Sequence, residues 1–183
     1  MKDKKNFMLI LLAFVVLLVG AGLLYKQFGD TPMPGTVAQT ENQETVPAPD
    51  FTVYDGDGNE VHLSDFLGKP VVVNFWASWC GPCQSEMPAF DKISAELEGE
   101  VVFMMINATD GGRETVDTAK AFIEAKGYTF PVYFDTTYEA NYRYGVTGLP
   151  TTYFIDTEGN AVGYISGALS EEILLQCIDL IVK

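Results

Sequence analysis

Apolar residues are concentrated near the start of the chain. Residues 7–25 form a run of 19 residues without a charge, FMLILLAFVVLLVGAGLLY, with three lysines before it and Lys26 directly after it. As a helix, this run would be about 28 Å long, close to the hydrocarbon thickness of a bilayer. It is therefore predicted to be a transmembrane signal anchor. The preceding lysines keep residues 1–6 on the cytoplasmic side and place the rest of the chain across the membrane.

A cleaved signal peptide is the alternative for the same segment, because Val19-Gly20-Ala21 provides an acceptable small-residue cleavage site. The apolar run continues beyond this site to Tyr25, which favours the anchor. No cysteine lies near the end of the run, so a lipoprotein anchor is excluded. Both interpretations place most of the chain outside the cytoplasm.

The chain is polar between the apolar run and about residue 49. It carries four prolines there and shows no sustained apolar period, a pattern typical of a flexible tether. Residues 26–46 are therefore predicted to be a linker, and residues 47–183 a folded domain. A flexible chain of this length has a root-mean-square reach of about 25 Å, which would keep the domain close to the membrane.

Strand-like and helix-like stretches alternate through the folded domain. Residues 71–76 are almost continuously apolar, as expected for the centre of a sheet, whereas the apolar residues of 83–97 recur at helical spacing. The order of elements predicts an α/β domain with a mixed central sheet and helices on both faces. Strands are predicted at 51–54, 60–63, 71–76, 101–106, 130–134, 151–155 and 161–165, and helices at 83–97, 115–126, 138–144 and after the capping residue Ser170.

The charge composition limits the possible partners. The chain has 11 Lys and Arg against 25 Asp and Glu, a formal net charge of −14. Residues 1–25 carry +2 and residues 26–183 carry −16, so the exported part is strongly acidic. Such a domain cannot neutralise a run of phosphates, which argues against nucleic acid as a partner. The mean hydropathy of +0.11 averages an apolar span and an acidic domain, and describes neither.

The three cysteines, Cys80, Cys83 and Cys177, provide the candidate chemistry. The first two lie in the motif WCGPC at residues 79–83, where a buried strand is predicted to end and a helix to begin. Two thiols at this spacing can close and reopen a small disulfide ring. The free N–H groups and the dipole of a helix N-terminus stabilise a thiolate on the first cysteine, so Cys80 is the candidate nucleophile. Cys83, one turn into the helix, is the candidate resolving thiol.

Three other interpretations of the cysteine pair are weaker. A zinc site would need Cys177 and the single histidine, His62, and neither shows ligand spacing to the pair. A structural disulfide that closes a four-residue ring stabilises a fold only slightly. A copper relay could use Met87, but no histidine lies close in the sequence. Redox chemistry is therefore the preferred interpretation.

Two longer motifs extend the pattern around the cysteines. The stretch VVVNFWASWCGPCQSEMPAF spans residues 71–90, and GVTGLPTTYFID spans residues 145–156. In this order they resemble the thioredoxin superfamily, and more closely its membrane-anchored ResA/TlpA-type thiol–disulfide oxidoreductases. The resemblance covers about residues 47–183. It implies a thioredoxin-like fold with an N-terminal hairpin and a central helix–strand insertion at residues 116–134.

The resemblance also implies a substrate-binding surface. It predicts that the Leu149–Pro150 peptide bond is cis, and X–Pro bonds are the only kind that adopts cis at low cost. The loop would lie against the cysteine pair and offer backbone groups to an extended substrate. The expected substrate-binding residues are Trp79, Gly81, Pro82, Leu149 and Pro150.

Glu86 is the third expected catalytic residue, after the two cysteines. Thioredoxin has a buried aspartate on the strand before the motif, whereas this chain has Asn74 at the matching position, and asparagine cannot take a proton. The ResA-like branch carries a glutamate where Glu86 stands, one turn beyond Cys83. A partly buried carboxylate there could accept the Cys83 proton and would raise the pKa of the thiols by charge repulsion. From the residues alone, an ordinary surface glutamate is the alternative.

The resemblance implies a membrane-tethered thiol–disulfide oxidoreductase on the extracytoplasmic side of the cytoplasmic membrane. The expected redox group is the Cys80–Cys83 disulfide, with no added cofactor or metal. The Gly-Pro dipeptide between the cysteines resembles that of the reducing thioredoxins, so the expected activity is reduction of disulfides in exported proteins. By analogy, the expected clients include apocytochrome c, and the expected electron donor is a membrane thiol transporter of the CcdA/DsbD type.

Other functions remain open on the sequence alone. A disulfide-introducing oxidase uses the same chemistry in the opposite direction. A metal-delivery or binding module on the same fold belongs to another class. A peroxidase is disfavoured because Ala77 stands three residues before Cys80, where a peroxiredoxin has threonine. Cys177 is expected to pack as a small apolar residue in the last helix, without a redox role.

Overall fold

The computed structural model describes residues 46–182. The predicted cytoplasmic tail (1–6), the predicted membrane span (7–25) and all but the last residue of the predicted linker (26–46) lie outside the described residues and stay predictions. Within the described part of the chain, no helix is both long and apolar enough to cross a bilayer.

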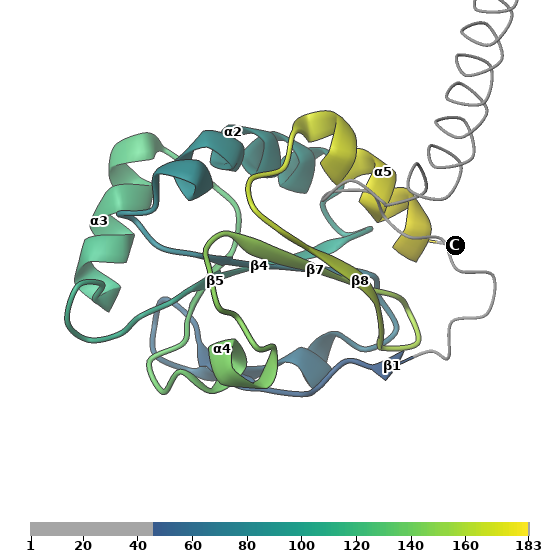
Figure 1. Ribbon diagram of the computed structural model, residues 1–183, viewed down its shortest axis with the longest axis horizontal. Helices are drawn as coiled ribbons and strands as arrows, with labels where there is room; N and C mark the ends of the chain where they lie inside the picture. The colour runs from purple at the N-terminus through teal and green to yellow at the C-terminus, as the bar shows by residue number, and fades with distance from the viewer. Residues whose placement is uncertain (1–45, 183) are drawn as a thin grey trace, which may run out of the picture. The chain divides into compact units, whose positions relative to one another are not determined.

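An eight-stranded sheet forms the centre of the domain (Figure 1). Its strands follow the order β1-β8-β7-β4-β5-β6-β2-β3. β4 pairs with β5 in parallel and with β7 in antiparallel orientation, so the sheet is mixed, as predicted. The strands are β1 (Val46–Pro47), β2 (Thr52–Tyr54), β3 (Glu60–His62), β4 (Val71–Trp76), β5 (Val102–Asn107), β6 (Val132–Phe134), β7 (Thr151–Ile155) and β8 (Asn160–Ser166).

Helices cover both faces of this sheet. α2, α3 and α5 lie along one face, and α4 lies on the other together with the short 3-10 helix η1 (Figure 1). The predicted helix–strand insertion is formed by α3 and β6. The helices are η1 (Leu63–Phe66), α2 (Gly81–Glu96), α3 (Val116–Lys126), α4 (Glu139–Arg143) and α5 (Glu171–Ile181).

The side chains of β4 alternate between two hydrophobic clusters. Val72 and Trp76 pack in the cluster beneath α2, α3 and α5, whereas Val73 and Phe75 pack in the cluster on the α4 side. All six residues of β4 are buried, because both faces of the strand are covered. Asn74 shares its face with Val72 and Trp76, since side chains alternate along a strand with a period of two. It therefore points toward α2.

The predicted elements are all present, with ends that differ by at most two residues. α2 begins at Gly81 and not at residue 83, because Cys80 caps the helix and a proline in the first turn removes only an N–H that has no partner within the helix. Two observed elements are not indicated by the sequence pattern. β1 is only two residues long and pairs with β8, and η1 is a single turn. Both are too short to show an apolar period.

Candidate active site

The Cys80–Cys83 pair lies at the start of α2, a few residues after the end of β4. The two residues form a disulfide, with their Cα atoms 5.3 Å apart. Cys80 is the N-cap of α2, and its sulfur accepts a hydrogen bond from the backbone N–H of Cys83 (3.2 Å). This sulfur therefore occupies the position at which the free N–H groups and the dipole of the helix stabilise negative charge.

The two cysteines differ in their exposure. Cys80 keeps 4% of its surface exposed, and Cys83 keeps none. Trp79, Gly81 and Pro82 beside them are all exposed. An incoming sulfur can therefore approach the pair from the Cys80 side. This asymmetry suits the two expected roles. The sulfur of Cys80 can react with a partner in solution, whereas the sulfur of Cys83 can react only with a group inside the protein.

The loop before β7 lies at the same end of the sheet as the cysteine pair. β4 and β7 are antiparallel, with Phe75 opposite Thr151, so the end of β4 meets the start of β7. The Leu149–Pro150 peptide bond is cis, which confirms the expectation from the resemblance. Leu149 packs against the hydrophobic cluster that contains both cysteines. The fold thus places Leu149 and Pro150 at the same end of the sheet as the cysteine pair.

Glu86 lies on the buried side of α2, one turn after Cys83, and only 2% of its surface is exposed. Its Oε1 accepts a hydrogen bond from Nδ2 of Asn74 (2.8 Å), and its Oε2 accepts one from the backbone N–H of Leu169 (2.8 Å). Burial raises the pKa of Glu86 to about 7, because the carboxylate loses its hydration and the two hydrogen bonds offset this loss only in part. The alternative of a surface glutamate is therefore wrong.

Asn74 connects Glu86 to the sheet. Its Nδ2 also donates a hydrogen bond to Oγ1 of Thr152 on β7 (2.9 Å), while its Oδ1 has no partner among residues 46–182. The aspartate expected at this strand position in thioredoxin is absent here, and a carboxylate from α2, that of Glu86, is hydrogen-bonded to the asparagine in its place. A carboxyl group with a pKa near neutrality can take up and return a proton at neutral pH.

A second buried carboxylate, Glu114, holds the segment that precedes the cysteines. It accepts hydrogen bonds from the N–H (3.0 Å) and the hydroxyl (2.7 Å) of Ser78, and from Nδ2 of Asn107 (2.8 Å). The sequence interpretation missed Glu114, because a glutamate in a polar turn before a helix resembles a surface residue. Its only sequence signal is its place after β5, which is parallel to β4 and ends at the same edge of the sheet.

Replacing Glu114 with alanine is expected to lower the free energy of unfolding by about 3 kcal/mol, because donors on the half-buried Ser78 and the buried Asn107 lose their acceptor. Urea unfolding of the oxidised protein measures this loss. The matched control is Glu124→Ala, which removes an exposed glutamate from α3 and should change stability by less than about 0.5 kcal/mol. An equally small change for Glu114→Ala would contradict the structural role.

Cys177 is separate from the active-site pair. It is a free cysteine on the buried side of α5, and burial raises the pKa of its thiol. Its packing agrees with the expectation of an apolar role. Across residues 46–182, no group of three or more His, Cys, Asp or Glu side chains is arranged to hold a metal ion.

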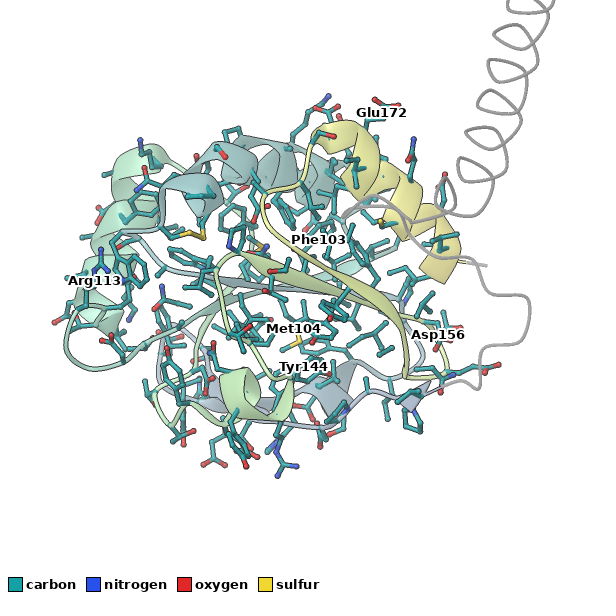
Figure 2. All side chains as sticks on the ribbon, viewed as in Figure 1. Phe103, Met104, Arg113, Tyr144, Asp156 and Glu172 are labelled. Carbon is teal, nitrogen blue, oxygen red and sulfur yellow. A yellow bond between two sulfur atoms is a disulfide. The ribbon has the colours of Figure 1, made fainter. Side chains whose placement is uncertain are left out.

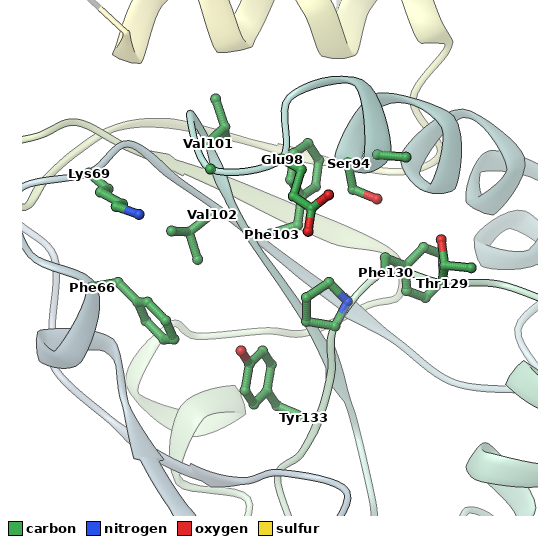
Figure 3. Close-up of a pocket in the computed structure, with 13 residues that line it drawn as sticks. Phe66, Lys69, Ser94, Glu98, Val101, Val102, Phe103, Thr129, Phe130 and Tyr133 are labelled. Atoms are coloured by element: carbon green, nitrogen blue, oxygen red, sulfur yellow. The ribbon is translucent and has the colours of Figure 1, made fainter.

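A pocket of about 360 Å³ lies at the other end of the sheet (Figure 3). Its walls come from the end of α2, the start of β5 and the segments before β4 and β6, and include Phe66, Glu98, Val102 and Tyr133. Because β5 runs parallel to β4, the start of β5 lies away from Cys80, which follows the end of β4. None of the expected site residues lines this pocket.

Comparisons with known proteins agree with this geometry. The model of the AhpC/TSA family matches residues 45–163. The chain is 32% identical to the thiol-disulfide oxidoreductase ResA of Geobacillus thermodenitrificans over 178 residues, which are 97% of this chain and 98% of the relative. A putative thiol:disulfide interchange protein DsbE from Chlorobium tepidum matches with a TM-score of 0.69 and 30% identity, over 77% of this chain and 99% of that one. The exposed lipoprotein thioredoxin Etrx1 of Streptococcus pneumoniae matches with a TM-score of 0.62 and 32% identity, over 72% of this chain and 99% of that one.

The matched region includes both the cysteine motif and the cis-proline loop. The structural similarities confirm the expected thioredoxin-like α/β fold. The chain therefore belongs to the AhpC/TSA family of thioredoxin-like proteins and is a thiol–disulfide oxidoreductase.

Proposed function

We propose that this oxidoreductase is a membrane-tethered reductant of disulfide bonds outside the cytoplasm. The observation that carries the proposal is the Cys80–Cys83 ring at the N-terminus of α2, with Glu86 buried on the same helix. In the reduced protein, the Cys80 thiolate attacks a client disulfide, forms a mixed disulfide and releases one client thiolate. The Cys83 sulfur then attacks Sγ of Cys80, which releases the second client thiolate and closes the ring. Two electrons pass from the protein to the client.

Glu86 is proposed to accept a proton during this reaction. The resolving step requires Cys83 as a thiolate, yet Cys83 is fully buried, and burial disfavours the charged form of a thiol. With a pKa of about 7, Glu86 can accept the Cys83 proton near neutral pH. The proton can then pass to water or to the departing client thiolate. When an electron donor reduces the ring again, the same carboxyl group can return a proton to Cys83.

The proposed client surface surrounds Cys80. Trp79, Gly81 and Pro82 are exposed beside it, and the Leu149–Pro150 loop lies at the same end of the sheet. An extended client segment placed along this loop would bring its disulfide to the exposed side of Cys80.

The location and the direction of the reaction are proposed from the sequence and the relatives. The apolar segment 7–25 would anchor the domain outside the cytoplasmic membrane, and one relative, Etrx1, is described as an exposed lipoprotein thioredoxin. The Gly81-Pro82 dipeptide favours a reductant. By analogy, apocytochrome c is a proposed client, and a membrane thiol transporter of the CcdA/DsbD type is the proposed donor.

The midpoint potential of the Cys80–Cys83 couple tests the direction. We expect a value of roughly −250 mV or lower, close to that of thioredoxin, from equilibration with dithiothreitol or glutathione. The reduced protein should also reduce insulin disulfides. A potential of roughly −120 mV, together with faster oxidative refolding of ribonuclease, would instead support the disulfide-introducing oxidase. Stoichiometric copper binding without disulfide exchange would support the metal-delivery module.

A further inference from the structure

Arg113 lies beside the active site, on the loop between β5 and α3 (Figure 2). Its guanidinium group stacks on the ring of Trp79, 3.7 Å from the ring centroid. Trp79 directly precedes the candidate nucleophile Cys80 and is 40% exposed. The stack therefore places a permanent positive charge on the surface that a client must approach.

The loop that carries Arg113 is held in place on both sides. Glu114, the next residue, accepts two hydrogen bonds from Ser78, in the segment just before the cysteines. Asp110 Oδ1 accepts hydrogen bonds from the backbone N–H groups of Gly112 (2.8 Å) and Glu114 (2.9 Å). The backbone of Arg113 is thus fixed relative to the cysteine motif, and the stack on Trp79 restricts its side chain. An incoming group would meet a preorganised cation.

The hydrogen-bonding capacity of this guanidinium is free. No hydrogen bond or ion pair joins the Arg113 side chain to another residue within 46–182, and the residue is exposed. A guanidinium that stacks through its face keeps its N–H groups at the edge, where they can bind a carboxylate in bidentate fashion. Asp110 is the acidic neighbour: hydrogen bonds from the loop backbone and, in smaller part, the charge of Arg113 lower the pKa of its carboxyl. Its Oδ1 is occupied by the loop backbone, and the two side chains form no ion pair.

Three other cations of the described domain have polar partners elsewhere. Lys92 pairs with Glu171, and Arg143 pairs with Glu139 on α4. Lys120 donates to the backbone oxygen of Gly56. Since residues 26–183 carry a charge of −16, the domain as a whole repels acidic segments. Arg113, which stacks on the residue before Cys80, would offer an acidic partner an opposite charge.

We propose that Arg113 is a specificity-determining residue, which binds a carboxylate that flanks the reactive cysteines of the partner. The substrate class is thus a polypeptide disulfide with a neighbouring Asp or Glu. This inference rests on the proposed function, because it names the substrate class of the same site.

The test compares two oxidised Cys-X-X-Cys peptides that differ only in a flanking Glu or Gln. Each is mixed with pre-reduced full-length protein, and the formation of the peptide dithiol and of the Cys80–Cys83 disulfide is followed by mass spectrometry after acid quenching. The wild type should reduce the Glu peptide about fivefold faster than the Gln peptide in dilute buffer. Salt at about 0.5 M should remove most of this preference.

Arg113→Gln should abolish the preference, whereas Arg113→Lys should keep part of it, because lysine retains the charge but not the planar fork. The matched control is Arg143→Gln, which removes an arginine from α4 on the opposite face of the sheet and should leave the preference intact. Circular dichroism of each variant confirms folding.

Two results would overturn the inference. One is a wild-type protein that reduces both peptides at the same rate, and the other is an Arg113→Gln variant that slows both peptides equally, as a purely structural role would. If the wild type reduces neither peptide and also fails to reduce insulin, the proposed function fails, and the inference fails with it.

Discussion

Replacing Cys83 with serine is expected to stop disulfide exchange half-way, with the client held on Cys80. The first attack needs only the Cys80 thiolate at the start of α2, which the substitution leaves in place. The second attack needs a sulfur at residue 83, and a serine hydroxyl is not ionised at neutral pH. Turnover of insulin should fall to background, and a mixed disulfide should accumulate that non-reducing electrophoresis and mass spectrometry detect.

Two further variants make this prediction specific. Cys80→Ser should lose both turnover and the mixed disulfide, because Cys83 is fully buried and unavailable to a client. Cys177→Ala, which alters the third cysteine on α5, should retain turnover. A mixed disulfide on Cys83 in the Cys80→Ser variant would reverse the assignment of the two roles.

Glu86 is expected to make the stability of the oxidised protein depend on pH. Its pKa is raised from 4.5 to about 7 by burial, so the folded protein holds a proton that the unfolded chain releases between these pH values. The contribution of Glu86 to stability is therefore fully present below pH 4.5 and is lost as the pH rises through 7. At about 1.4 kcal/mol per pKa unit, the loss is about 3 to 4 kcal/mol.

The Glu86→Gln variant should lack this loss. Urea unfolding of wild type and variant at about pH 5 and about pH 8 measures it, with the ring oxidised so that Cys80 and Cys83 do not titrate. Glu96→Gln is the control, because it removes an exposed carboxylate from the same helix and should keep the wild-type pH dependence. The same pH dependence in wild type and Glu86→Gln would contradict the raised pKa.

The same substitution tests proton transfer in the reduced protein. Without a carboxyl group at residue 86, the rate of the resolving step should lose its inflection near pH 7 and should fall at neutral pH. Alkylation of the thiols as a function of pH provides the second measurement, since loss of the neighbouring negative charge should lower the pKa of Cys83. If both the cysteine titration and the reductive rate are unchanged, Glu86 has no role in the reaction.

Much of the active site could be predicted because its chemistry is local in the sequence. The spacing of Cys80 and Cys83 and the change from a buried strand to a helix around them depend only on neighbouring residues. The position of Glu86 one turn later follows from the helical period. The cis peptide bond before Pro150 is different, because only the resemblance to a family indicated it and the structure was needed to confirm it.

The contacts that support the site could not be predicted in this way. Glu86 accepts a hydrogen bond from the backbone N–H of Leu169, 83 residues later in the chain. Glu114 accepts one from the backbone N–H of Ser78, 36 residues earlier. Neither glutamate differs from a surface glutamate in its immediate sequence. Arg113 likewise reaches Trp79 only because β4 and β5 are parallel and their following loops lie at the same edge of the sheet.

The sequence by itself determined the order of strands and helices and the redox pair, because these depend on periodicity and on spacing along a short stretch of chain. The candidate proton acceptor, Glu86, was indicated only by the resemblance to a family. Only the tertiary structure decided that the pKa of Glu86 lies near 7, that Glu114 holds Ser78 in the segment before the cysteines and that Arg113 stacks on Trp79. Desolvation, hydrogen bonding and charge at these positions depend on segments that are distant in sequence and become neighbours only when the sheet and its helices pack together.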